Sequence, residues 1–148
     1  MSFIAVVIIA ISIVAFGIYD CLKYKKDTKT LEETVSLLKL FKNEINYRKA
    51  DFYNLICIGE NQGYKNIQFA DGKIIPFFSQ SSVFSKDFIR FLEQIGTTDA
   101  MGQVELCDEY IEKFSTYLEK QKSKEEAKIQ VNLSLSVLGA VSLLIIFV

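Results

Sequence analysis

The hydrophobic and charged positions of this chain divide it into three blocks. The first 19 residues carry no charged side chain, and neither do the last 20, from Ile129 to Val148. All 18 acidic and all 17 basic residues lie between Asp20 and Lys128. A helix of about 20 apolar residues, rising ~1.5 Å per residue, spans the ~30 Å hydrocarbon core of a bilayer. The pattern therefore predicts a soluble block between two segments of bilayer length.

The first uncharged block has two interpretations, a membrane anchor or a cleaved secretory signal peptide. A signal peptide needs basic residues before its apolar run and small residues at the cleavage site. Met1 and Ser2 offer no basic side chain, and residues 16–19 form a poor cleavage site. We expect an uncleaved transmembrane anchor over residues 1–22, a helical domain over 23–128 and a transmembrane helix over 129–148.

Lysines flank both expected spans on the side that faces the central block. They are Lys23, Lys25, Lys26 and Lys29 after the first span, and Lys120, Lys122, Lys124 and Lys128 before the second. Positive charge beside a membrane segment stays on the cytoplasmic side. We therefore expect a cell-membrane protein with a cytoplasmic central domain and both termini extracytoplasmic.

Apolar residues recur at helical spacing in the central block. From Leu31 to Lys49 they form one face, and Thr28 or Thr30 is expected to cap the start of this helix. A shorter helix is expected to begin at Phe52 and to end near Gly59 or Gly63. The expected fold is all-α, a helical bundle between two transmembrane helices.

Residues 63–85 are harder to interpret. Asp71-Gly72 is a turn signal, and Pro76 disfavours helix just before it. We expect short helical turns with loops, and a two-stranded hairpin about Asp71-Gly72 is the alternative. A helix over Lys86–Ile95 should follow, with Ser85 as its N-cap.

The corner before the last helix has the clearest capping chemistry in the chain. Gly96 supplies the left-handed residue that commonly ends a helix. Thr97 or Thr98 is expected to cap the next helix, Asp99 favours the positive end of its dipole, and Gln103 could fasten the turn to the preceding helix. This corner is interpreted as a structural joint, with contact to a partner protein as the alternative.

The last helix has no strong breaker from Ala100 to the end of the chain, so we expect it to continue into the membrane. Its soluble part has an apolar seam, formed by Val104, Cys107, Ile111, Phe114 and Leu118. The seam is expected to pack into the core of the same chain, and packing against a partner helix is the alternative. Its uncharged part carries small and polar residues on one side, which are expected to pack against a membrane helix, at Asn132, Ser136, Gly139 and Ala140.

The composition excludes several kinds of site. Because the chain has no histidine, it cannot form a Ser-His-Asp triad, a Cys-His pair or a metal site with histidine ligands. Its three cysteines are far apart and lack the spacing of metal ligands. The acidic run Glu105, Asp108, Glu109 and Glu112 fits a solvated helix face. No phosphate-binding loop or nucleophile motif occurs, and the interleaved charges form no basic stripe for nucleic acid. We expect no catalytic residue, no cofactor and no metal.

Several spaced motifs together resemble the stage III sporulation protein AB family of endospore-forming bacteria. They are Leu92 with Gly96-Thr97-Thr98-Asp99-x-x-x-Gln103, Gly17 with Leu31, Leu38 and Glu44-Ile45-x-Tyr47, and Lys128 with Val137-Leu138-Gly139. Ala100 and Met101 stand where the family usually has a basic and an acidic residue.

The resemblance implies a cytoplasmic helical bundle similar to the cytoplasmic domain of the type II secretion inner-membrane platform protein. It implies a non-catalytic platform in the secretion-like channel complex between mother cell and forespore, in the mother-cell membrane. The implied partners are the complex's cytoplasmic secretion-type ATPase and its other membrane subunits. Lipid would surround the spans, and self-association is left open.

Two other functions remain as alternatives. The first is a small membrane sensor or signalling subunit that transmits a change along the long last helix, although no ligand pocket is evident. The second is a pore-forming protein, which a well-patterned soluble domain between two spans makes unusual.

Overall fold

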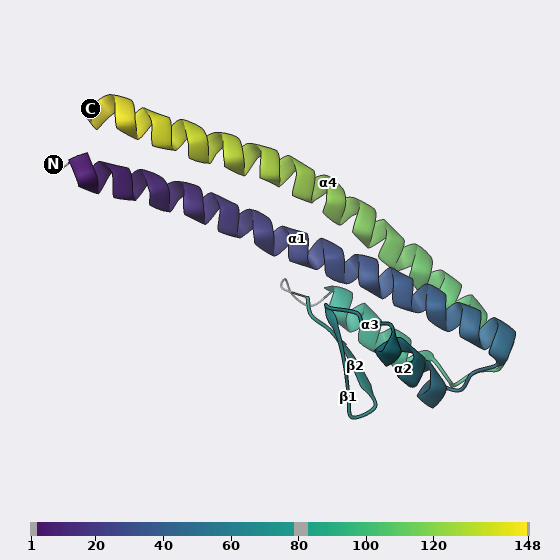
Figure 1. Cartoon of the computed structure of the whole chain (residues 1–148). Coiled ribbons are helices and arrows are strands. Elements are labelled where there is room, and N and C mark those ends of the chain that lie inside the picture. Colours follow the sequence, from purple (N-terminus) through teal and green to yellow (C-terminus); the bar gives the residue numbers. More distant parts are fainter. Residues whose placement is uncertain (1–2, 79–82, 148) are drawn as a thin grey trace. The chain divides into compact units, whose positions relative to one another are not determined.

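A computed structural model describes residues 3–78 and 83–147 of the chain. Its described part contains four helices and one hairpin, in the order α1 (Phe3–Arg48), α2 (Phe52–Asn61), β1 (Ile67–Ala70), β2 (Lys73–Pro76), α3 (Val83–Gln94) and α4 (Ala100–Phe147). The expected all-α class is confirmed in its main part, because the protein is mostly helical (Figure 1).

The chain forms two compact units, to each of which both long helices contribute. Unit 1 comprises Met1–Lys25 and Gln121–Val148, and unit 2 comprises Lys26–Lys120. Unit 1 therefore consists of the first part of α1 and the last part of α4. Unit 2 contains the rest of both helices together with α2, α3 and the hairpin.

Helix α1 is longer than the sequence pattern predicted. A separate helix starting near Leu31 is wrong, because α1 is continuous from Phe3 to Arg48. No proline or glycine lies between Ile18 and Leu31, so nothing there interrupts a helix. Thr30 is buried within α1 and does not cap it; its Oγ1 lies 3.0 Å from the carbonyl oxygens of both Lys26 and Phe77.

Residues 67–76 form a β-hairpin, so the expectation of helical turns there is wrong and the alternative holds. The strands pair antiparallel with Ala70 opposite Lys73 and Phe69 opposite Ile74. Asp71 and Gly72 both have positive φ, 51° and 72°, as a two-residue type I′ turn requires. The sequence signal was the Asp-Gly pair, whereas the alternation on either side of it was weak.

Helix α3 begins before the predicted cap. It already includes Val83, so Ser85 lies inside its first turn and is not its N-cap. Residues 79–82 lie outside the described part of the chain. Helix α2 is confirmed, and its N-cap is Asp51, whose Oδ1 accepts a hydrogen bond of 2.9 Å from the backbone N–H of Asn54.

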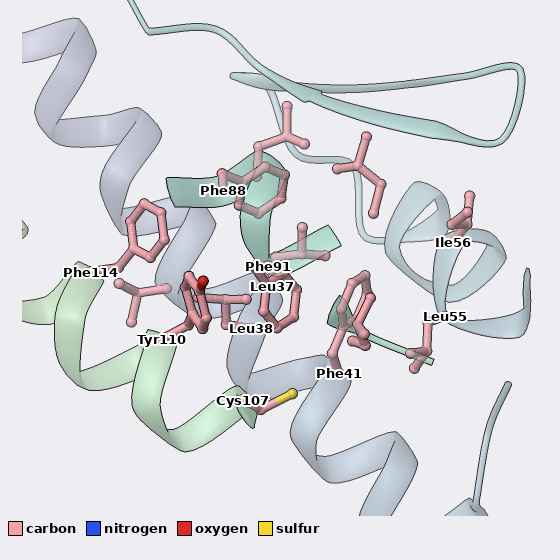
Figure 2. Packing of buried hydrophobic residues seen from close by; sticks show 14 of the residues in the cluster. Leu37, Leu38, Phe41, Leu55, Ile56, Phe88, Phe91, Cys107, Tyr110 and Phe114 are labelled. Carbon is pink, nitrogen blue, oxygen red and sulfur yellow. The ribbon is translucent and has the colours of Figure 1, made fainter. Parts of the chain in front are cut away.

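The hydrophobic core lies in unit 2, where residues of α1, α2, α3 and α4 meet beside the hairpin (Figure 2). Helix α1 contributes Leu37, Leu38 and Phe41, and α3 contributes Phe88 and Phe91, all almost fully buried. The hairpin is tied to α1 by Glu33, whose carboxylate accepts hydrogen bonds from both the backbone N–H (2.7 Å) and the Nδ2 (2.9 Å) of Asn66.

The apolar seam of α4 packs into this core. Cys107 and Phe114 are fully buried, and Val104, Ile111 and Leu118 are partly buried against the same cluster. Core packing within the chain, which the seam predicted, is therefore confirmed. Aromatic rings continue the contact between α3 and α4, since Phe114 meets Phe88 edge to face at 6.2 Å between ring centroids.

One helix in the described part of the chain is long and apolar enough to cross a membrane. This helix is α1, over Val7–Arg48, and few side chains of its apolar stretch are buried. Length and composition are what this assignment rests on, and the second expected span over 129–148 stays a prediction.

Candidate functional site

The corner between α3 and α4 is held by capping contacts on both sides. Gly96 has φ +85°, a left-handed conformation, so the prediction for this glycine is confirmed. The Thr97 hydroxyl donates a hydrogen bond of 2.6 Å to the carbonyl of Gln94, the last residue of α3. Thr97 thus completes the end of α3 and does not cap the start of α4.

Asp99 is the N-cap of α4, which corrects the prediction of a threonine cap. Its Oδ1 accepts a hydrogen bond of 2.9 Å from the backbone N–H of Gly102. Gln103 does not reach α3, because its Nε2 donates to the carbonyl oxygen of Thr98 at 2.9 Å, within the corner itself. Asp99 caps the helix, and the threonines do not, because Asp99 directly precedes the first helical residue. From that position a side-chain oxygen reaches the third helical N–H.

The corner lies at the same end of unit 2 as the end of α1. Lys42 Nζ contacts Asp108 Oδ1 at 2.6 Å, and both helices extend from this contact toward that end, α1 to Arg48 and α4 back to Ala100 (Figure 1). Here Gly96, Thr97, Thr98 and Asp99 are exposed and Gln103 is half-buried.

Large side chains are exposed at this end. Tyr47 near the end of α1 is 81% exposed, Tyr53 at the start of α2 is 72% exposed, and Met101 in the first turn of α4 is 75% exposed. We call Tyr47, Tyr53, Met101 and the corner residues 96–99 the end surface. Tyrosine and methionine are enriched in protein interfaces relative to the rest of the surface.

In unit 1, α1 and α4 approach each other at the small and polar residues of the predicted stripe. Gly17 is buried, and a Cβ atom at this position would overlap the Ser136 hydroxyl and lie 3.3 Å from the Ser136 Cβ. One turn along, Asn132 Nδ2 lies 3.4 Å from Asp20 Oδ2. A small cavity of about 140 Å³ lies between these residues.

Gly139 of the stripe is not brought to this contact. No described atom of another element lies within 4 Å of a Cβ built on Gly139. The side chain of Ala140 lies outside the described residues.

The sequence reading missed a buried carboxylate in unit 2. Asp87 of α3 is 5% exposed and meets two side chains of α4. The Tyr117 hydroxyl donates a 2.7 Å hydrogen bond to its Oδ2, and Lys113 Nζ lies 3.0 Å from its Oδ1. Arg90 lies 3.7 Å from the same Oδ1. A signal was present, since Asp87 falls on the apolar face of α3 between Phe84 and Phe91, but its partners are about 30 residues away.

The partners of Asp87 determine its ionisation. Burial acts to raise the pKa of Asp87, but the Tyr117 hydrogen bond and the positive charges of Lys113 and Arg90 outweigh it and hold the pKa below 3.8. The same hydrogen bond to the carboxylate, with burial, raises the pKa of Tyr117 to about 12. Asp87 is thus a charged anchor that joins α3 to α4 throughout the neutral range.

Chemically reactive groups are not gathered in the described part of the protein. The acidic run Glu105, Asp108, Glu109 and Glu112 is exposed, as a solvated face predicts. Within residues 3–78 and 83–147, no three His, Cys, Asp or Glu side chains converge as metal ligands. Burial raises the pKa of the Cys107 thiol to about 12, so it stays protonated and unreactive.

Comparisons with known proteins add no relative, since no family model, no curated protein and no solved structure matches the chain.

Proposed function

We propose that this protein is a non-catalytic, membrane-anchored platform subunit that joins a cytoplasmic partner to other membrane subunits. The observation that carries the proposal is the contrast in exposed surface between its two units. Unit 1 exposes large apolar side chains, such as Phe16 at 72% and Leu135 at 63%, and unit 2 buries a core beneath a charged surface. Unit 1 therefore suits lipid and unit 2 suits water.

Both segments of unit 1 cross the membrane together in this proposal. The charge-free ends of the chain and their flanking lysines support two spans with the central domain in the cytoplasm. The contacts of Gly17 with Ser136 and of Asp20 with Asn132 support it further. Small and hydrogen-bonding residues are what bring helices together in lipid, where apolar side chains give no preference for protein over solvent.

The end surface of unit 2 is the proposed docking face for the cytoplasmic partner. Tyr47, Tyr53 and Met101 offer exposed contact area on a rigid support, because the capped corner and Asp51 hold the helix ends that carry them. Interface binding energy concentrates in a few such side chains.

The resemblance described above makes the proposal specific. It supports a role in the sporulation channel complex between mother cell and forespore, with the secretion-type ATPase as the cytoplasmic partner. The exposed Tyr47 and the corner residues Gly96 to Gln103 belong to the motifs that carry this resemblance, and they lie at one end of unit 2.

Topology is tested first, with reporter fusions to the full chain. Alkaline phosphatase, active only outside the cytoplasm, should be active when fused to either terminus and inactive when inserted in the hairpin turn between Asp71 and Gly72. Fluorescent-protein fusions at the same three positions should give the reverse pattern. An active phosphatase at the hairpin, or an inactive one at the C-terminus, contradicts the two-span topology.

The partner is tested by co-purification with the secretion-type ATPase encoded in the same spore-forming host. The double substitution Tyr47→Ala and Met101→Ala should lower recovery of the ATPase at least tenfold, because it removes two exposed contact side chains. The matched control is Glu105→Ala with Glu112→Ala, which changes two exposed residues of α4 outside the end surface and should leave recovery unchanged. Equal losses in both variants contradict the proposed face.

Loss of the gene in that host should stop spore development after engulfment and leave vegetative growth unchanged. A vegetative growth defect would instead favour the sensor alternative.

A further inference from the structure

A groove in unit 2 lies between the hairpin, α3 and Phe52 at the start of α2. It encloses about 380 Å³ and is lined mainly by apolar side chains. Its lining residues are Phe52, Gly72, Lys73, Ile74, Ile75, Ile89, Leu92 and Glu93.

Two isoleucines of the lining are exposed. Ile75 of β2 is 45% exposed and Ile89 of α3 is 53% exposed. Their neighbour Ile74 is 4% exposed and belongs to the core. The patch thus contains both a hollow and apolar side chains of a size that would fill such a hollow. Exposed branched apolar side chains beside an apolar groove are typical of an interaction surface.

The same patch contains one positive and one negative side chain. Lys73 follows the hairpin turn and Glu93 lies near the end of α3. Within the described residues, neither forms an ion pair, whereas Lys42, Arg90 and Lys113 do. A patch that carries both charges, a hollow and exposed apolar side chains can complement a second copy of itself.

We propose that the groove is occupied by a second copy of this chain, in a twofold contact. In such a contact the same patch serves both copies, so each residue contact occurs twice. Ile89 and Ile75 of each copy enter the groove of the other, and Lys73 of each copy pairs with Glu93 of its mate. A different protein as occupant would have to bring both charges in the matching arrangement, while a second copy supplies them by symmetry.

The contact is modest in size, so a high local concentration favours it. Two-dimensional confinement in a membrane supplies that concentration for an anchored chain. The contact itself uses unit 2 residues and does not depend on the membrane topology. Failure of the reporter-fusion test would therefore leave it standing, and its own failure would leave the topology standing.

Thiol-specific cross-linking tests the contact directly in the full chain reconstituted in lipid vesicles. The background is Cys21→Ser with Cys57→Ser, and Cys107 stays silent because it is fully buried. In this background Ile89→Cys should give a covalent dimer with a short bis-maleimide, because each residue 89 enters a groove that residue 89 of its mate lines. The matched control Glu105→Cys, exposed on α4, should give at most a tenth of that yield.

A charge exchange tests the pairing in detergent micelles, with the dimer fraction measured by sedimentation equilibrium. Lys73→Glu and Glu93→Lys should each raise the dimer dissociation constant about tenfold, because each places like charges face to face twice. Combining the two substitutions should restore the wild-type value within about twofold. Lys39→Glu, a charge reversal at an exposed position of α1, should have no effect.

Three results would overturn the proposal. They are a wild-type chain that is monomeric in both micelles and vesicles, equal cross-linking at residues 89 and 105, and a double charge exchange that is no better than the single ones. Unchanged far-ultraviolet circular dichroism in every variant verifies that the fold is retained.

Discussion

The two units of this protein place apolar and polar side chains in opposite ways. Unit 2 buries aromatic rings such as Phe88 and Phe114 and exposes most of its charges, whereas unit 1 exposes Ile8, Phe16 and Leu135 and buries Gly17 and Ser136. Hydrophobic burial drives packing only where water is the alternative. With unit 1 in lipid, as the proposed function has it, the stability of each unit has a different source.

The largest expected effect is a core truncation in unit 2. Phe114→Ala removes a fully buried ring that contacts Phe88, Tyr110 and Tyr117, and should lower the free energy of unfolding by about 3–5 kcal/mol. Denaturant unfolding of the full chain in micelles, followed by tyrosine fluorescence, measures it. Phe16→Ala, at a side chain 72% exposed in unit 1, is the control and should change the unfolding of unit 2 by less than about 0.5 kcal/mol. A comparable loss in both would remove the distinction between the units.

Asp87→Asn should cost unit 2 about 1–3 kcal/mol at pH 7, because Lys113 then loses its buried anionic partner. The pKa of Asp87 is lowered by folding, so its contribution is complete above the unfolded-state value of about 4 and is lost as pH falls through the lower folded-state value. The difference between wild type and variant should therefore shrink below about pH 4. Unfolding curves at pH 7, 5, 4 and 3 measure this.

The exposed pair of Lys42 and Asp108 provides the control for Asp87. Its side chains are 33% and 52% exposed, so Asp108→Asn should cost less than about 1 kcal/mol despite the short 2.6 Å contact. A loss of stability equal to that of Asp87→Asn would show that burial does not determine how much these charges contribute to the free energy of unfolding.

A cap removal at the corner should have a smaller effect. Asp99→Ala should destabilise unit 2 by about 1 kcal/mol, because it leaves the Gly102 N–H without its side-chain acceptor. Asp99→Asn should retain most of the stability, since asparagine caps almost as well. Thermal unfolding of the variants, with Thr98→Ala beside them, decides whether the aspartate or the threonine caps α4. A larger loss for Thr98→Ala would reverse the assignment.

The smallest expected effect is the loss of a polar contact in unit 1. Asn132→Leu removes the 3.4 Å contact with Asp20, and such contacts between membrane helices average about 0.6 kcal/mol. Gly17→Cys with Ser136→Cys, in the Cys21→Ser and Cys57→Ser background, should form an intramolecular disulfide, and Asn132→Leu should lower its yield about threefold at most. Gly17→Cys with Gly139→Cys is the control pair and should cross-link poorly. Abolition of the first cross-link by Asn132→Leu would mean that this contact dominates the pairing.

Local patterns in the sequence predicted most of the helical structure. Helical periodicity, the left-handed glycine at Gly96 and the absence of breakers in α4 depend on residues within a few turns of one another, and each of these expectations is confirmed. The seam containing Cys107 and Phe114 was identified as core for the same reason. Expected helix starts at Leu31 and Ser85 were wrong, because capping residue types alone do not interrupt or begin a helix.

The tertiary structure decided what depends on distant residues. The hairpin is fastened at its base by Glu33 of α1, more than 30 residues away, which local alternation does not reveal. Asp87 became an anchor because folding brings Tyr117 and Lys113 to it, and its place on the apolar face of α3 did not show which residues it would meet. The sequence by itself determined the three blocks of charge, the helical periodicity and the left-handed glycine of the corner, since these follow from local patterns. The tertiary structure decided which polar residues of different helices contact one another. A contact between residues distant in the sequence exists only once the chain between them is ordered.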